Sequence, residues 1–85
     1  MYKVFYSKQA VKALRKLPKA LSRRICGKID LLAAAPHQYK QSKILAGMNA
    51  SRLRVGDWRI IYSIDNGRME ILIIKVAPRG EVYKR

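Results

Sequence analysis

Alternating side chains between residues 52 and 76 constrain the fold of this chain more than any other feature of its sequence. Two turn sequences, Gly56-Asp57 and Asp65-Asn66-Gly67-Arg68, divide the alternating stretch into the runs Arg52–Val55, Trp58–Ile64 and Met69–Val76. Alternation indicates half-buried strands, and Gly-Asp and Asn-Gly are turn sequences of β-hairpins. The pattern predicts a three-strand antiparallel meander whose first turn is a two-residue turn of type II′.

The first half of the chain has the spacing of one strand and two helices. Tyr2–Tyr6 alternates and is rich in aromatic and β-branched residues, which is typical of a strand. Ser7 is a suitable N-cap for a helix over Lys8–Leu17, and Pro18 ends that helix. Apolar residues then recur at helical spacing over Lys19–Ala34. We therefore expect an α+β fold, with an N-terminal strand and two helices packed on one face of an antiparallel sheet that the meander completes.

The length of the chain and its cysteine content narrow the class of protein. The 85 residues suffice for one core, so we expect a single domain over residues 1–85. Cys26 is the only cysteine, which excludes an internal disulfide and favours a reducing compartment. No apolar run has the length of a signal peptide or of a membrane span. These features predict a cytoplasmic protein with no membrane partner.

Positive charge dominates the composition. The chain has 19 Lys and Arg against 5 Asp and Glu, a net charge of +14, and residues 1–50 hold eleven of the basic residues and a single acid, Asp30. Such an excess destabilises a compact domain by self-repulsion unless a polyanion balances it. Nucleic acid, an acidic membrane surface and an acidic protein are the partners to consider, and a generic basic surface is the simpler alternative.

The predicted register of the first hairpin gathers three arginines on one face of the sheet. A two-residue turn at Gly56-Asp57 places Arg54 opposite Arg59, and alternation places Arg52 on the same face. The other face then carries the residues suited to the core, namely Leu53, Val55, Ile60, Tyr62 and Ile64. Clustered like charges require an anion between them, and the guanidinium fork matches phosphate oxygens. A solvated outer face of a basic protein remains the alternative.

Simple alternation also places four apolar residues on this arginine-bearing face, namely Ile61, Leu72, Ile74 and Val76. Two explanations stay open at this point. Either a partner covers them, such as RNA bases or the apolar side of a helix from another chain, or the N-terminal strand or the loop of this chain does so.

The tail after the last strand adds Arg79 and Tyr83, which emerge at the same end of the sheet as Arg59. Arginines can stabilise the negative charge of a phosphoryl-transfer transition state, and a tyrosine can stack on a base or position a proton. Alternatively, Tyr83 packs the C-terminus against the sheet. No metal site is predicted, because His37 is the only histidine, Cys26 is isolated and the acids are scattered. We therefore expect no metal and no other cofactor.

Three stretches resemble the RelE/ParE superfamily of bacterial toxins: Phe5–Leu17, Leu45–Gly47 with Arg52–Tyr62, and Ile74–Tyr83. The resemblance covers nearly the whole chain. It implies the strand–helix–helix–meander fold and an antitoxin that blocks the basic face in a toxin–antitoxin hetero-oligomer. For the RelE group it also implies cleavage of mRNA in the ribosomal A site, where a 2′-hydroxyl attacks the adjacent phosphate.

The resemblance also implies roles for individual residues. Arg52 and Arg54 match two basic residues that are often lysines, and Arg59 matches the arginine at the scissile phosphate. Arg79 and Tyr83 match the arginine and tyrosine of the family's tail. The chain departs from the pattern at Pro78, which replaces a basic residue or histidine, and it ends two residues after Tyr83. Because arginine hardly deprotonates, the identity of the general base stays open.

The sequence thus predicts a metal-independent endoribonuclease that acts with the ribosome on mRNA. We expect four further basic residues to contact RNA, namely Arg23 and Arg24 in the second helix and Lys40 and Lys43 in the polar segment after it. The alternative is a ParE-like inhibitor of DNA gyrase without nuclease activity, and a passive RNA-binding module is a third possibility.

Overall fold

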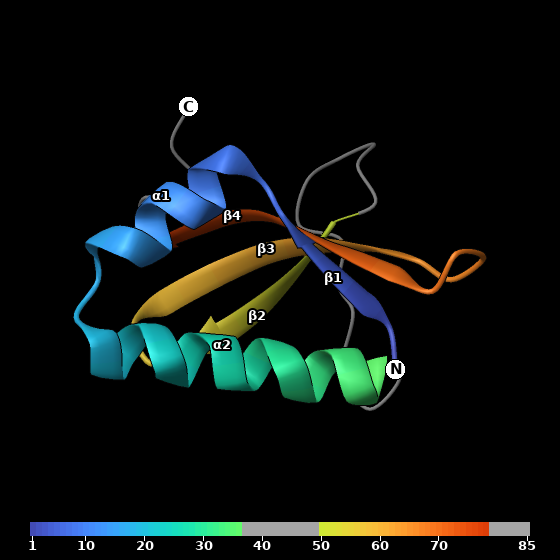
Figure 1. The fold of residues 1–85 in the computed structure, drawn as a ribbon, viewed down its shortest axis with the longest axis horizontal. Helices are drawn as coiled ribbons and strands as arrows, with labels where there is room; N and C mark the ends of the chain where they lie inside the picture. Colours follow the sequence, from blue (N-terminus) through green and yellow to red (C-terminus); the bar gives the residue numbers. More distant parts are fainter. Residues whose placement is uncertain (37–49, 79–85) are drawn as a thin grey trace.

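The computed structural model describes residues 1–36 and 50–78. Four strands and two helices follow one another in the predicted order (Figure 1). They are β1 (Lys3–Tyr6), α1 (Lys8–Lys16), α2 (Lys19–Ala34), β2 (Ser51–Val55), β3 (Trp58–Asp65) and β4 (Glu70–Pro78). Neither helix is long and apolar enough to cross a membrane, as far as the described residues extend.

Both ends of α1 follow from local sequence. The Ser7 hydroxyl accepts a hydrogen bond from the backbone N–H of Ala10 at 3.1 Å, which confirms the predicted N-cap. The helix ends at Lys16, one residue before the predicted end at Leu17, which has an extended backbone. A residue that precedes proline is disfavoured in the helical conformation, and Pro18 follows Leu17. Pro18 then opens α2 without a side-chain cap.

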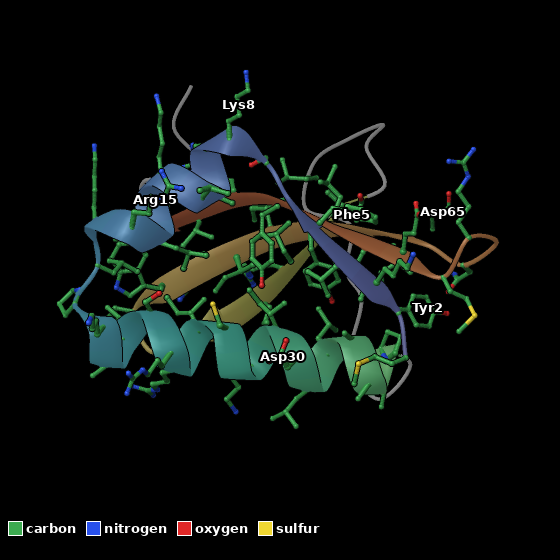
Figure 2. The ribbon with its side chains drawn as sticks, viewed as in Figure 1. Tyr2, Phe5, Lys8, Arg15, Asp30 and Asp65 are labelled. Carbon is green, nitrogen blue, oxygen red and sulfur yellow. The ribbon has the colours of Figure 1, made fainter. Side chains whose placement is uncertain are left out.

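The sheet is mixed rather than wholly antiparallel. Its strand order is β1-β4-β3-β2, and the meander of β2, β3 and β4 is antiparallel as predicted. β1 pairs with β4 in parallel, with Val4 opposite Ile71 and Tyr6 opposite Ile73. A hydrogen bond of 2.8 Å from the Tyr2 hydroxyl to Asn66 Oδ1 joins the start of β1 to the β3–β4 turn, toward which Tyr2 points in Figure 2.

The β2–β3 hairpin has the predicted register. Val55 pairs with Trp58, Arg54 with Arg59 and Leu53 with Ile60, so the turn consists of two residues. Gly56 has a φ of 59°, whereas Asp57 has no positive φ. Positive φ at the first central residue alone is the requirement of the predicted type II′ turn.

The β3–β4 turn is longer than the Asn-Gly pair. Asp65 pairs with Glu70, which leaves four residues in the loop. The Asp65 carboxylate accepts a hydrogen bond of 3.1 Å from the backbone N–H of Arg68, and the positive φ of 55° falls on Met69. Met69 therefore belongs to the turn, and β4 extends two residues beyond the predicted end at Val76.

Both helices cover one face of the sheet, and the core lies between them. Helix residues Ile25, Ile29 and Leu32 are fully buried against Tyr62 and Ile73 of the sheet. The five residues predicted for the core face all belong to or pack against this cluster, namely Leu53, Val55, Ile60, Tyr62 and Ile64. In Figure 1, α1 lies along β4, and α2 lies along β2.

A bulge in β4 corrects one prediction about its faces. Ile61 pairs with Lys75 whereas the next residue, Tyr62, pairs with Ile73, so β4 holds one extra residue at Ile74. Side chains alternate strictly along a strand, and an extra residue shifts the alternation by one. Val76 is therefore buried in the helix-covered core, and its predicted place beside the arginines was wrong.

Candidate functional site

Three arginines lie together on the sheet face that the helices leave uncovered. Arg54 and Arg59 are directly opposite each other in the β2–β3 ladder, and such residues have Cβ atoms about 4.5–5.5 Å apart. Arg52 pairs with Ile61, which belongs to a cluster separate from the helix-covered core. The structure therefore brings together Arg52, Arg54 and Arg59, as the sequence predicted. We call this surface the arginine face.

The three arginines differ in exposure. Arg52 and Arg54 are exposed, whereas only 7% of Arg59 is accessible. The Arg59 guanidinium folds back to the hairpin turn, where Nη1 donates long hydrogen bonds to the carbonyls of Gly56 at 3.5 Å and Trp58 at 3.4 Å. Bonds of this length are weak, and the planar guanidinium carries five N–H donors in all. Arg59 is thus held against the hairpin turn, whereas Arg52 and Arg54 have exposed side chains.

A fourth arginine approaches the same turn from the helix side. The two terminal nitrogens of Arg24 lie 3.8 and 3.9 Å from the point where a Cβ would stand on Gly56. Arg24 is therefore near the turn that Arg59 contacts from within the sheet. Arg23, also predicted to bind RNA, is exposed one residue earlier on α2. Positive charge thus continues around the β2–β3 turn from the arginine face to α2.

A small apolar cluster lies beside the arginine face. Ala50, Ile61 and Ala77 are buried, and Ile74 packs against them. Ile61 and Ile74 were predicted for this face, and the structure places both there. Leu72, also predicted for this face, is 42% exposed and pairs with Phe5 of β1, which is exposed as well. The uncovered apolar surface is therefore smaller than simple alternation predicts and is concentrated near β1.

Four predicted site residues lie outside the described residues: Lys40, Lys43, Arg79 and Tyr83. The carboxylates of the sheet lie apart from the three arginines or in the exposed turn. Asp65 and Glu70 pair with each other where β3 ends and β4 begins, at the opposite end of β3 from Arg59. Asp57 is exposed in the turn itself. Within residues 1–36 and 50–78, no three His, Cys, Asp or Glu side chains gather as possible metal ligands.

A cavity that no sequence pattern predicted lies near Trp58, at the end of β3 that carries Arg59. It has a volume of about 440 Å³ and lies between α1 and the end of β4. Its lining comprises Gln9, Lys12, Ala13, Lys16, Leu17, Trp58, Lys75, Val76, Ala77 and Pro78. The spacing of Lys12 and Lys16 places both on one face of the helix and could have indicated that part of the lining. The sequence did not indicate that Lys75 also lines the cavity.

One tyrosine has a strongly shifted pKa. Burial, the charges of Cys26 and Asp30, and a hydrogen bond with Cys26 together raise the pKa of Tyr6 to about 12, with burial the largest cause. Tyr6 lies on the helix-covered side of β1, where it packs against the core. It stays protonated at neutral pH and is remote from the arginine face, so it cannot act there as a base.

The chemistry of the guanidinium group limits the reactions that the arginine face can support. Arg52, Arg54 and Arg59 can bind phosphate oxygens and neutralise developing negative charge, but they cannot accept a proton. The fold and this face together define a small, basic α+β protein with clustered arginines on the sheet face opposite its helices.

Comparison with known proteins gives the family. Residues 4–83 match the model of the family described as the ParE toxin of type II toxin–antitoxin systems, parDE. Because the match spans nearly all of the chain, the protein belongs to this family, within the RelE/ParE superfamily of type II toxins. Among curated protein sequences, none matches.

Solved structures share the fold. A chain of the archaeal RelE–RelB complex from Pyrococcus horikoshii matches with 37% identity and a TM-score of 0.76, over 93% of this chain and 96% of that chain. A RelBE toxin–antitoxin complex from Mycobacterium tuberculosis matches with 23% identity and a TM-score of 0.79, over 92% and 98% of the two chains. The isolated RelE toxin of E. coli matches with 22% identity and a TM-score of 0.76, over 98% and 92%.

Proposed function

We propose that this toxin is a metal-independent endoribonuclease that cleaves mRNA in the ribosomal A site. The observation that carries the proposal is the pairing of Arg54 with Arg59 on an uncovered sheet face that also holds Arg52. Directly opposed like charges are unfavourable in a sheet unless an anion lies between them. The phosphodiester backbone of RNA supplies such an anion, and the guanidinium fork fits its oxygens.

In the proposed reaction, the 2′-oxygen of one nucleotide attacks the adjacent phosphorus while the bond from phosphorus to the 5′-oxygen breaks. The products are a 2′,3′-cyclic phosphate and a 5′-hydroxyl. The 2′-hydroxyl loses a proton and the leaving 5′-oxygen gains one, so no water or redox partner is consumed. Arg52, Arg54 and Arg59 stabilise the additional negative charge of the transition state.

Proton transfer requires groups other than these arginines, because guanidinium hardly deprotonates. We assign Arg79 and Tyr83 to the same site, where the tyrosine hydroxyl can position a proton or the ring can stack on a base. Arg23, Arg24, Lys40 and Lys43 are proposed to hold RNA phosphates outside the reacting centre. The whole chain, residues 1–85, would act as one domain, in the cytoplasm where ribosomes translate.

The proposed partner is an antitoxin. The matching structures from Pyrococcus horikoshii and Mycobacterium tuberculosis are toxin–antitoxin complexes, and the first of them is 37% identical to this chain. This likeness supports a cognate antitoxin that forms a hetero-oligomer with the toxin and covers its arginine face.

Primer extension on a reporter mRNA in a purified translation system tests the proposal. Wild-type protein should produce breaks at in-frame codon positions, and Arg54→Gln and Arg59→Ala should abolish them. Arg54 is exposed, so its replacement tests the charge without disturbing the core. Lys28→Gln removes one charge from an exposed position on α2 and should leave the breaks unchanged.

Intact mRNA with wild-type protein would overturn the proposal. Because the matching family model is that of the ParE toxin, the next assay would then be DNA supercoiling by gyrase. Inhibited supercoiling without mRNA cleavage would establish the gyrase inhibitor in place of the nuclease.

A further inference from the structure

We propose that the cavity between α1 and the end of β4 is a nucleotide-binding subsite that holds one phosphate and one base of single-stranded RNA. This inference rests on the proposed function and adds a second point of contact for the same strand. The cavity volume of about 440 Å³ falls within the range of sites for small ligands.

The backbone around the cavity is already hydrogen-bonded, which argues against an added peptide strand. β1 pairs with β4 only as far as Ile73, yet the edge beyond it is occupied. The Ser7 hydroxyl donates to the carbonyl of Ile74 at 2.6 Å. The Gln9 amide donates to the carbonyl of Val76 at 3.1 Å and accepts from its N–H at 3.0 Å. Recognition here must therefore use side chains.

Those side chains carry positive charge. Lys12 and Lys16 come from α1, where residues four apart are neighbours on one face, and Lys75 comes from the bulged part of β4. None of the described residues that line the cavity is acidic. The charges of Lys12 and Lys16 on one helix face repel each other, and a phosphate bound between them removes that repulsion.

An aromatic ring completes the site. Trp58 lines the cavity and is partly buried against the core, so its indole is held in place, and Pro78 is its cross-strand partner. Nucleobases of any sequence stack on such aromatic surfaces, and stacking beside positive charge is the usual arrangement in proteins that bind single strands. Phosphate and base together define a nucleotide rather than an acidic peptide.

Neighbouring residues of β3 connect the cavity to the arginine face. Trp58 and Arg59 are consecutive residues of β3, and their side chains point to opposite sides of the sheet, one toward the helix-covered core and one toward the arginine face. A strand bound at the arginine face that passes over this end of β3 and β4 meets the cavity with a neighbouring nucleotide.

Trp58 is the only tryptophan in the chain, so its fluorescence reports on the cavity directly. The probe is a single-stranded RNA hexanucleotide with 2′-O-methyl riboses, which lacks the attacking 2′-hydroxyl and therefore stays intact. Wild-type protein should show saturable quenching. Lys12→Gln with Lys16→Gln should weaken the binding about tenfold at moderate salt, because phosphate contacts dominate the affinity for RNA.

The matched control is Lys8→Gln with Lys28→Gln, which removes the same charge from exposed positions outside the cavity lining. It should change the affinity less than twofold, and Lys75→Gln alone should weaken binding measurably. Absence of quenching, or equal weakening by both double variants, would overturn the subsite. Equal displacement of the RNA by a polyglutamate peptide would replace it with a site for an acidic protein.

Failure of this inference is distinguishable from failure of the proposed function. Codon-specific mRNA breaks without quenching would leave the nuclease in place and remove the subsite. Specific quenching without mRNA breaks would leave the subsite in place and remove the nuclease.

Discussion

Single side chains complete the hydrogen bonding of β4 beyond the point where its pairing with β1 ends. Gln9 reaches from α1 to both the N–H and the carbonyl of Val76, at 3.0 and 3.1 Å, and so imitates the backbone of an additional strand residue. An unpaired strand edge is a liability, because another chain can pair with it. Gln9 therefore both ties α1 to the sheet and protects this edge.

Replacing Gln9 with alanine should lower the free energy of unfolding by about 1–2 kcal/mol, because both Val76 groups lose their partner in a part-buried position. Urea unfolding monitored by circular dichroism measures the change. Lys8→Ala, at the neighbouring exposed position of the same helix, serves as the control and should shift the free energy by less than 0.5 kcal/mol, about the range of surface substitutions. Equal effects of the two variants would contradict the assigned role of Gln9.

The raised pKa of Tyr6, about 12, makes stability depend on pH above pH 10. Below pH 10 the tyrosine is protonated in both states. Between pH 10 and pH 12 the unfolded chain ionises and the folded chain does not, so stability is lost as pH rises. Compared with Tyr6→Phe, wild-type protein should therefore lose more stability between pH 9 and pH 12 in thermal unfolding. Parallel curves for the two proteins would refute the shift.

At the scale of elements, the β2–β3 hairpin depends on one glycine conformation. Gly56 has a φ of 59°, which side-chain-bearing residues rarely adopt, whereas Gly27 lies within α2 with nothing near the position of a Cβ. Gly56→Ala should therefore destabilise the protein by about 1–2 kcal/mol. Gly27→Ala should instead stabilise it by about 0.4–1 kcal/mol, since alanine is the better helix former.

Chemical unfolding of the two variants measures the change in the free energy of unfolding, which should have opposite signs for the same glycine-to-alanine substitution. A neutral or favourable effect at position 56 would show that the turn tolerates another conformation, and the register of Arg54 with Arg59 would then lose its support. Loss of mRNA cleavage with Gly56→Ala, at full folding, would link that register to the arginine site.

The elements that the sequence predicted are those that local rules determine. Ser7 and Pro18 bracket α1, and the two-residue turn at Gly56 fixes the pairing of Arg54 with Arg59, which defines the arginine face. The parallel pairing of β1 with β4 and the bulge at Ile74 depend on contacts between distant segments, for which no local pattern exists. The cavity could not be predicted for the same reason, because residues distant in sequence, such as Lys12 and Lys75, line it only in the folded chain.

At the scale of the whole molecule, charge is distributed unevenly over the sheet. Arg54 and Arg59 lie beside the β2–β3 turn, whereas Asp65 and Glu70 pair at the other end of β3 and β4. On α1, Lys8 and Arg15 point away from the sheet in Figure 2, so the helix layer is basic as well. The described residues thus present positive charge on two sides, and with a net charge of +14 for the chain, RNA affinity should depend steeply on salt.

Removing two phosphate contacts should reduce that salt dependence by a defined amount. For single strands, the slope of log affinity against log salt is about −0.7 per neutralised phosphate, so Arg52→Gln with Arg54→Gln should make the slope less negative by about 1.4. Fluorescence anisotropy of labelled, 2′-O-methylated RNA between 50 and 200 mM salt, roughly the range in which such effects are large, measures it. Lys3→Gln with Arg68→Gln is the control of equal charge, at exposed positions near Asp65 and Glu70 at the other end of the sheet from Arg54, and its slope should stay that of the wild type.

The bulge in β4 has a consequence for how genes of this family can diverge. If the codon for Ile74 were deleted, Ile73, Lys75 and Val76 would become consecutive, and regular alternation would keep both Ile73 and Val76 on the helix-covered side. The hydrophobic core would survive, and Lys75 would remain opposite Ile61 on a flatter strand. A gap of one residue in related sequences therefore belongs at Ile74, and relatives with this gap would retain the fold while losing the local bend that the bulge gives β4.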